Sequence, residues 1–440
     1  MKKRFRIIIC TLLTLTLLIS AACIPASSYE PDVVTSTADM ILVNTDTNTV
    51  VFSQKPDNKW YLGDLVTLIT YLVASDSIED PAKVTYKVEK SFIDNLPFSD
   101  GCLDAYVGQT LTAKDLMAIM LLSYGNDAAY ALVELSGYAT TEEFVTAMND
   151  KVAALGCTKT LIVSPGYSEN SKQHTTCREM YYIYSAVRDT KLFNEIEGSF
   201  TYTPEGFKGE EYTVENRASI MNPNSPYYFK YVNDAKYSYG DKTYEGIAMT
   251  TTYRDKTYFF AGLLGKGTSE ENVYADAKKL TTWAYLNLSD RKVINAGNSF
   301  AKTVVNAGWG SYEMELHPFS SAYKTLPNDF EESKLSYDIT LPKSVNWPLA
   351  KGQSVGKAQI TYDSEPIENI DLVSESEEGL DMLSDAARFG SYVWGKLLVN
   401  EPATQPPTEP AAQPSAESAT QAVSETATQP ATEAATEKEG

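Results

Sequence analysis

The sequence predicts an α/β (α+β) fold in which helices flank an antiparallel sheet, followed by a small all-β domain. Between 39 and 290, strand-like stretches stand at both ends and helix-like stretches lie between them. This order favours an antiparallel sheet covered by helices. From 296 to 375, β-rich stretches follow one another between turns. A chain of 440 residues with 43% hydrophobic residues is long and apolar enough to form two domains with tails.

The first domain is expected to open with a hairpin and continue with helices. MILVNTDTNTVVF, at 40–52, has two β-rich runs around a polar turn. The apolar run at 62–76 predicts a helix, and LTAKDLMAIMLLSYG at 111–125 predicts a second one with Thr112 as its N-cap. Further helices are expected at 126–137, at 141–156 and at 272–288.

The second half of the chain supplies the remaining strands. EGIAMTTTY and KTYFFAGLLG predict paired strands around the turn Arg254-Asp255. In the β domain, SKLSYDITL alternates apolar with polar residues and places Leu335, Tyr337 and Ile339 on one face. KAQITYDSEPIENIDLV predicts a further hairpin, so this part of the chain is expected to be entirely β.

Both ends of the chain are expected to lie outside the folded core. Basic MKKRFR followed by IIICTLLTLTLLIS predicts a secretory signal peptide at 1–22, with a retained membrane helix as the alternative. Residues 23–38 are expected to be a linker, and Cys23 stands where a lipoprotein cysteine would stand, so its lipidation stays open. At 380–398 we expect an amphipathic helix that either packs on the β domain or lies on a membrane. The Pro/Thr/Ala/Glu-rich segment 401–440 is expected to be disordered.

Charge and cysteine content exclude several classes of partner. The formal net charge of −21 argues against nucleic acid and against electrostatic docking on anionic lipid, both of which need clustered cations. Past the signal peptide, Cys23, Cys102, Cys157 and Cys177 are widely spaced and form no Cys-x-x-Cys pair. This argues against a zinc site, and the sequence predicts no metal and no cofactor. One disulfide and buried free thiols stay open as alternatives.

Several landmarks, in a consistent order, carry a family resemblance. YGNDAAYALVE is similar to a family segment SGNDAA-x-ALAE, and SPGYSENSKQHTTCREM resembles NPHGL…H-x-(S/T)T-x-x-(D/E)-M. AKKLTTWAYLNL resembles the helix that closes the family's first domain, and WPLAKGQSVGKAQITYDSEPIENIDLV resembles its β-domain ending. With the opening hairpin, these pieces resemble the D-alanyl-D-alanine carboxypeptidases, the low-molecular-weight penicillin-binding proteins. The resemblance implies a penicillin-binding or serine β-lactamase-like domain and a small β domain.

The resemblance implies acyl transfer by three motifs around a cleft. Ser-x-x-Lys supplies a nucleophile and its base, Ser-x-Asn handles the proton and the substrate backbone, and Lys-Thr-Gly on a strand meets the substrate's carboxylate and lines the oxyanion hole. Alignment of LITYLVA with the family's IMTALVA places Asp64 at the serine and Thr67 at the lysine. Tyr124 replaces the serine of the second motif and Asn126 is kept, whereas GIAMTTTY stands against G-I-K-T-G-Y-T. The positions that match the family's active site are therefore Asp64, Thr67, Tyr124, Asn126, Ala248, Met249 and Thr250.

These substitutions predict that the family's reaction is lost, so no residue is assigned as catalytic. A serine nucleophile needs a neighbouring base, and in the alignment both the serine and the lysine base are replaced. Asp64 adds an anion where both lysines are replaced. Two like charges about 4 Å apart repel by roughly 4 kcal/mol at an effective dielectric near 20, so a cleft without cations should reject an anionic substrate. Asp64 also has a structural interpretation as a helix N-cap.

Possible substitute catalytic groups are given structural interpretations. Ser123 stands one residue before the motif serine, about 100° away around a helix. His174 matches a histidine that belongs to a structural loop in the family. The two literal Ser-x-x-Lys matches, at 321–324 and 354–357, fall in the β domain and open no core helix.

The sequence therefore predicts an exported cell-envelope protein of this family that is catalytically inactive and serves as a peptidoglycan-related binding or scaffolding module. Peptidoglycan stem peptides and envelope proteins are the expected partners, at the extracellular face of the membrane or in the wall. Membrane contact is expected only through a lipid on Cys23 or through the 380–398 helix. Two alternatives stay open. One is an active serine-type carboxypeptidase or hydrolase with rearranged groups. The other is a lipid-tethered surface protein that acts through its β domain and acidic tail.

Overall fold

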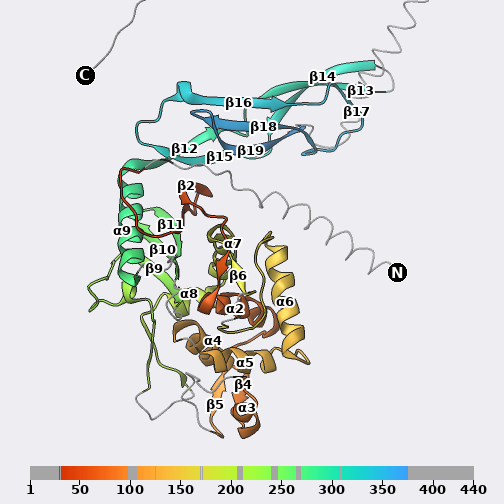
Figure 1. Ribbon diagram of the computed structural model, residues 1–440. Coiled ribbons are helices and arrows are strands. Elements are labelled where there is room, and N and C mark those ends of the chain that lie inside the picture. Colours follow the sequence, from red (N-terminus) through yellow and green to blue (C-terminus); the bar gives the residue numbers. More distant parts are fainter. Residues whose placement is uncertain are drawn as a thin grey trace, which may run out of the picture. The chain divides into compact units, whose positions relative to one another are not determined.

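The computed structural model shows a helix-flanked sheet domain followed by a β domain (Figure 1). The residues that it describes are 29, 31–97, 107–123, 125–168, 170, 172–205, 212–238, 246–263, 269–307 and 310–374. The expected signal peptide, the 380–398 helix and the 401–440 tail lie outside these residues, as do Cys23, Cys102 and Tyr124.

A five-stranded antiparallel sheet organises the first domain, in the order β2-β1-β11-β10-β9. Its strands are β1 (Asp39–Asn44), β2 (Thr49–Gln54), β9 (Val232–Ser238), β10 (Gly246–Tyr253) and β11 (Lys256–Leu263). The predicted opening hairpin is confirmed as β1-β2, and the predicted strand pair around Arg254-Asp255 is confirmed as β10-β11. β9 was not predicted as a strand, yet it forms one edge of the sheet.

Helices cover both faces of this sheet (Figure 1). The helices are α2 (Val66–Ser77), α3 (Lys90–Asp94), α4 (Ala113–Leu122), α5 (Asn126–Leu135), α6 (Thr141–Ala154), α7 (Cys177–Arg188), α8 (Lys191–Glu197) and α9 (Glu270–Asn287). Alternating side chains of each strand enter two separate cores, as expected for a buried sheet. Ile41 and Val43 pack in the core that contains α2 and α4, whereas Met40 and Leu42 pack in the core that contains α9.

Short 3₁₀ helices and strand pairs complete the first domain. The 3₁₀ helices are η2 (Gly63–Leu65) and η4 (Ser219–Met221), and the short strands are β3 (Trp60–Tyr61) with β6 (His174–Thr175), β4 (Thr85–Lys87) with β5 (Thr110–Thr112), and β7 (Thr201–Tyr202) with β8 (Val214–Glu215). η2 runs directly into α2, so the predicted 62–76 helix begins with a 3₁₀ turn.

The second domain is all β, as predicted. Its elements are β12 (Leu288–Ile294), β13 (Ala301–Ala307), β14 (Gly310–Pro318), β15 (Ala322–Pro327), η5 (Glu332–Lys334), β16 (Leu335–Thr340), β17 (Val345–Asn346), β18 (Ser354–Tyr362) and β19 (Glu365–Ser374). The predicted second hairpin is confirmed as β18-β19. β16 is an edge strand, and the apolar face predicted for it is only partly buried. Tyr337 is 39% and Ile339 38% exposed.

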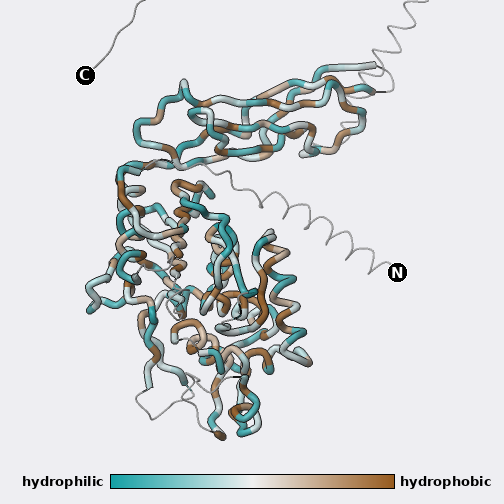
Figure 2. The backbone as a smooth tube through the Cα atoms, viewed as in Figure 1, coloured by the Kyte–Doolittle hydropathy of each residue, from teal (hydrophilic) through white to brown (hydrophobic). Residues whose placement is uncertain are grey.

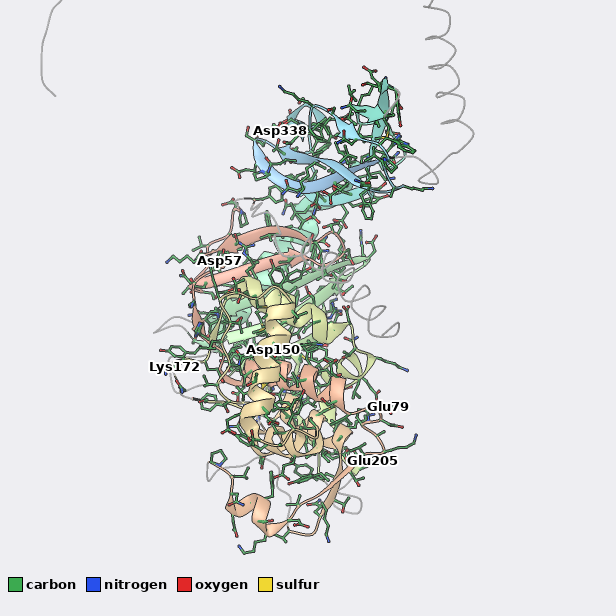
Figure 3. All side chains as sticks on the ribbon, turned by 90° about the vertical axis from the view of Figure 1, so that its right-hand side faces the viewer. Asp57, Glu79, Asp150, Lys172, Glu205 and Asp338 are labelled. Carbon is green, nitrogen blue, oxygen red and sulfur yellow. The ribbon has the colours of Figure 1, made fainter. Side chains whose placement is uncertain are left out.

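The hydropathy of the chain follows this architecture. Apolar residues (brown) gather along the sheet and the inner helices, and they alternate with polar residues along the strands of the β domain (Figure 2). The charged side chains labelled in Figure 3, among them Asp57, Asp150 and Lys172, are exposed and project from the surface. Cys157 and Cys177 are buried free thiols. No helix in the described ranges has the length and apolar character needed to cross a membrane.

We expect Thr112→Ala to lower the free energy of unfolding by about 1 kcal/mol, because Thr112 is the N-cap of α4, as predicted, and closes a capping box there. Its Oγ1 accepts from the Asp115 amide (3.0 Å), and an Asp115 carboxylate oxygen accepts from the Thr112 amide (3.2 Å). Urea unfolding measures the change. Thr146→Ala, on the exposed side of α6, is the matched control and should cost nothing; equal losses in the two variants would contradict a capping role.

Candidate functional site

The first motif lies at the start of α2 and is closed off from solvent. Asp64 is in η2 and only 4% exposed. Its backbone amide donates to Ser238 Oγ of β9 (2.9 Å). Thr67 is also buried, and its hydroxyl donates to the Asp64 carbonyl (2.7 Å). The Thr67 hydroxyl is thus engaged with the backbone one turn before it.

The expectation that Asp64 serves as an N-cap is wrong. Leu62 is the N-cap of η2 and Leu65 that of α2, and neither has a side-chain capping bond. Gly63 has φ of 50°, in the left-handed region that glycine adopts readily, and this turn places Asp64 inside η2 rather than before it. The Asp64 amide is instead satisfied by Ser238.

The second motif keeps its asparagine in an ordered position. Asn126 is the first residue of α5, and its Oδ1 accepts from the Tyr167 amide (2.6 Å). A Cβ on Gly166 would lie 2.3 Å from the same oxygen, so only glycine lets this loop approach so closely. Ser123 donates to the Ile119 carbonyl (2.9 Å), as an ordinary hydroxyl at a helix end does. Tyr124 lies outside the described residues.

The third motif was expected on β10, but the structure places these residues one strand away from Asp64. Ala248 is buried in the core on the α2 side of the sheet, and Met249 is buried in the opposite core with α9. Thr250 donates to Asp234 Oδ2 (2.7 Å). The expectation that Met249 lines the cleft is therefore wrong, because strand alternation turns it to the other face of the sheet.

The strand that lies beside Asp64 is β9, and it carries a lysine that sequence reasoning missed. Lys236 is 2% exposed and lies two residues before Ser238, so both side chains are on the same face of the strand. Lys236 Nζ donates to the carbonyl oxygens of Met120 (3.2 Å) and Leu121, at the end of α4. The predicted absence of cations at this site is therefore wrong.

Buried carboxylates accompany Lys236. Burial lowers the pKa of Lys236, and the charges of Glu197 and Asp64 oppose that shift. Burial raises the pKa of Glu197 to about 8, while Lys236 favours its ionised form. Asn216 Nδ2 donates both to Glu197 Oε2 (3.0 Å) and to the Ala235 carbonyl of β9 (3.2 Å). The site is thus a buried polar network that joins β9 to η2, α4 and α8.

The other candidate residues lie apart from this network. His174 pairs through its backbone with Leu161, and its Nδ1 contacts the Lys172 carbonyl. The serine at 321 accepts from the Ala296 amide, while the lysine at 324 pairs with Glu368. The match at 354–357 lies in β18 and the match at 321–324 leads into β15, so neither opens a helix. Within the described ranges, no group of three or more His, Cys, Asp or Glu side chains has a metal-binding arrangement.

Comparison with known proteins decides the family. Residues 26–260 match the family model for D-alanyl-D-alanine carboxypeptidase (peptidase S11). The chain belongs to this carboxypeptidase family. Residues 289–379 match the model for the C-terminal domain of penicillin-binding protein 5, so the β domain is also the one that such carboxypeptidases carry.

Individual relatives share low sequence identity with this chain but align over most of its length. The carboxypeptidase DacA of Haemophilus influenzae is 23% identical and aligns over 82% of this chain and 88% of its own length. The carboxypeptidase DacF of Bacillus subtilis is 20% identical over 74% of this chain and 81% of its own. Among solved structures, penicillin-binding protein 5 of H. influenzae superposes with a TM-score of 0.64 and 21% identity, over 79% of this chain and 98% of that one. The carboxypeptidase DacD of Francisella tularensis gives a TM-score of 0.59 and 16% identity, over 79% and 95%.

We expect the stability of the protein to fall as pH rises from 5 to 8, and Glu197→Gln to reduce this fall. The folded state keeps the Glu197 proton up to about pH 8, whereas the unfolded chain releases it near the ordinary value of 4.5. In this window the folded state binds more protons, so the free energy of unfolding decreases with pH, by at most about 1.4 kcal/mol per unit.

Urea unfolding at several pH values measures the slope for the wild type and the variant. Glu142→Gln, on the exposed side of α6, is the control and should keep the wild-type slope. Identical slopes in the wild type and Glu197→Gln would show that Glu197 does not hold this proton.

Proposed function

We propose that this chain is a non-catalytic member of the carboxypeptidase family that serves the cell envelope as a binding or scaffolding module. The observation that carries this proposal is the bond between the Asp64 amide and Ser238 Oγ (2.9 Å). In serine acyl-transfer sites, backbone amides hold the oxygen that becomes negative in the transition state. Here the backbone amide at the nucleophile position, that of Asp64, already donates its hydrogen bond to the Ser238 side chain.

The charges of the site support the same conclusion. We assign Lys236-Tyr237-Ser238 of β9 to the place of the third motif, because β9 rather than β10 lies against η2. The lysine of that motif is then kept, but its ammonium group is buried on the Met120 and Leu121 carbonyls. A cation held in this way is not available to meet the terminal carboxylate of a substrate.

The two hydroxyls described at the site, those of Thr67 and Ser238, are engaged with the Asp64 backbone and do not replace the lost nucleophile. Asp64 offers a carboxylate, and attack by a carboxylate on a peptide would form a mixed anhydride that needs a base for its breakdown. Thr67 stands at the lysine position of the first motif, and its hydroxyl cannot serve as a base. The loss of a nucleophile or base in a comparable triad lowers turnover by roughly a million-fold.

The family and the N-terminal sequence support a place of action in the cell envelope. The family is associated with the cell envelope and acts on peptidoglycan stem peptides. We place this protein outside the cytoplasmic membrane, exported by the signal peptide at 1–22, with peptidoglycan stem peptides or envelope proteins as partners. Attachment through a lipid on Cys23 is a separate proposal, and resistance of processing to globomycin would contradict it.

An active hydrolase with rearranged groups is the second candidate. The survival of Lys236 and Asn126 favours it, because two of the family's polar groups then remain, Lys236 near Asp64 and Asn126 at the start of α5. Reaction with penicillin separates the two candidates, since only a working nucleophile forms a covalent adduct.

We expect no covalent adduct when the purified full chain is incubated with a fluorescent penicillin and examined by intact mass. The H. influenzae carboxypeptidase DacA, treated in parallel, is the positive control. A stable adduct on residues 60–70 would overturn the proposal of lost catalysis and favour the second candidate.

We expect Asp64→Ser with Thr67→Lys to form a penicillin adduct only when Ser238→Gly is added. The first two changes supply a nucleophile and a base, and the third frees the amide that must hold the acyl oxygen. Intact mass after a timed incubation measures the adduct, and circular dichroism checks folding. Equal labelling with and without Ser238→Gly would show that the Ser238 contact does not block the site.

A further inference from the structure

A cavity of about 280 Å³ lies away from the family's motif positions, where β4, α3 and α5 come together. In Figure 1 these elements form the end of the first domain opposite the sheet. The cavity is lined by Tyr86, Lys87, Glu89, Ser91, Phe92, Asn95 and Glu134. Its volume suits a short chain of a few heavy atoms rather than a folded partner.

One wall of the cavity is aromatic and rigid. Tyr86 and Phe92 are 8% and 7% exposed, so the bulk of each ring is packed into the domain. Their centroids are 5.3 Å apart with an interplanar angle of 74°, an edge-to-face pair. The wall therefore combines apolar surface with the negative face of an aromatic ring, to which cations are attracted.

Two carboxylates complete the cavity. Glu134 Oε2 accepts from the Tyr86 hydroxyl (2.8 Å), which fixes that carboxylate beside the ring. Burial raises the pKa of Tyr86, and the charges of Glu134 and Glu89 raise it further, so both carboxylates act on the same ring. Within the part of the chain that the structure describes, neither Glu89 nor Glu134 forms an ion pair.

The nearby lysines do not neutralise these carboxylates. Lys90 pairs with Asp94 on the exposed side of α3 (2.8 Å). Lys87 also lines the cavity, but it is exposed on β4 and forms no ion pair with Glu89 or Glu134 in the described part of the chain. The cavity thus holds a local excess of negative charge next to an aromatic wall.

We propose that this cavity binds a primary ammonium group at the end of a short alkyl chain. The alkyl chain lies on the Tyr86–Phe92 wall, and the ammonium group donates to Glu134 and Glu89. Charge-assisted hydrogen bonds and the ring quadrupole both favour a cation, and both disfavour a carboxylate at the same place. A free diamine and the side chain of a basic residue in a peptide present this same group. The site goes beyond the proposed function and is independent of whether the closed motif site reacts.

The test is an NMR titration of the full chain with matched probes that differ only in the end group. Cadaverine represents a free diamine, and Nα-acetyl-lysine methylamide represents a peptide side chain. Pentan-1-ol and pentanoate are the neutral and anionic controls. We expect at least one amine to bind about tenfold or more tightly than pentan-1-ol, the equivalent of about 1.4 kcal/mol, and pentanoate not to bind.

Variants locate the binding site. Glu134→Gln keeps an acceptor for the Tyr86 hydroxyl and removes only the charge, so it should weaken amine binding about tenfold while leaving pentan-1-ol unchanged. Glu142→Gln, on α6, is the matched control and should leave amine binding unchanged. Binding of the peptide probe alone points to a peptide partner, and binding of both amines supports the shared chemistry.

Three results would overturn the proposal. One is that neither amine binds. Another is that pentan-1-ol binds as tightly as the amines, which would make the cavity merely apolar. The last is that Glu134→Gln, folded by circular dichroism, binds the amines as tightly as the wild type. None of these results depends on the penicillin experiment, so the proposed function and this site fail separately.

Discussion

The burial of a single ammonium group organises the centre of the first domain. Lys236 is removed from water, and a buried charge is tolerated only with acceptors and countercharges around it. The end of α4 supplies two carbonyl oxygens, where the helix dipole is also negative, and Asp64 supplies a carboxylate, to which Glu197 adds a second when it loses its proton above about pH 8. The cation thereby holds three separate elements against one strand, and their positions determine the shape of the whole site.

This requirement gives the aspartate at position 64 a physical reason. In a site that depends on a reactive hydroxyl, a carboxylate at this position means that the nucleophile is missing. Beside a buried lysine, the same carboxylate serves as a countercharge. The change of Gly to Ser at the end of the assigned third motif fits the same logic, because the hydroxyl of Ser238 satisfies an amide that a substrate oxygen would otherwise satisfy. The two substitutions are therefore mutually compatible within a buried polar interior.

Much of the fold was predictable because its signals are local. The β1-β2 hairpin, the β10-β11 pair and the Thr112 cap follow from alternation, turn residues and capping chemistry within a dozen residues. The third motif was misplaced because GIAMTTTY matches the family's letters, whereas the neighbour of Asp64 is decided by strand order, a long-range property. β9 escaped notice for a related reason. Its segment VNDAKYS carries charged residues that only a polar interior can bury, so it does not have the pattern of a buried strand.

The edge position of β9 has a consequence for the behaviour of the protein at high concentration. A sheet edge with unpaired backbone groups is a template for strands of other molecules, and natural proteins protect such edges. Asn216 covers the Ala235 carbonyl of β9, and the packing of η2 at Ser238 shields the end of the strand. An edge that is useful for capturing an extended peptide is also a hazard for self-association. The contacts of Asn216 and η2 protect part of the β9 edge from pairing with strands of other molecules.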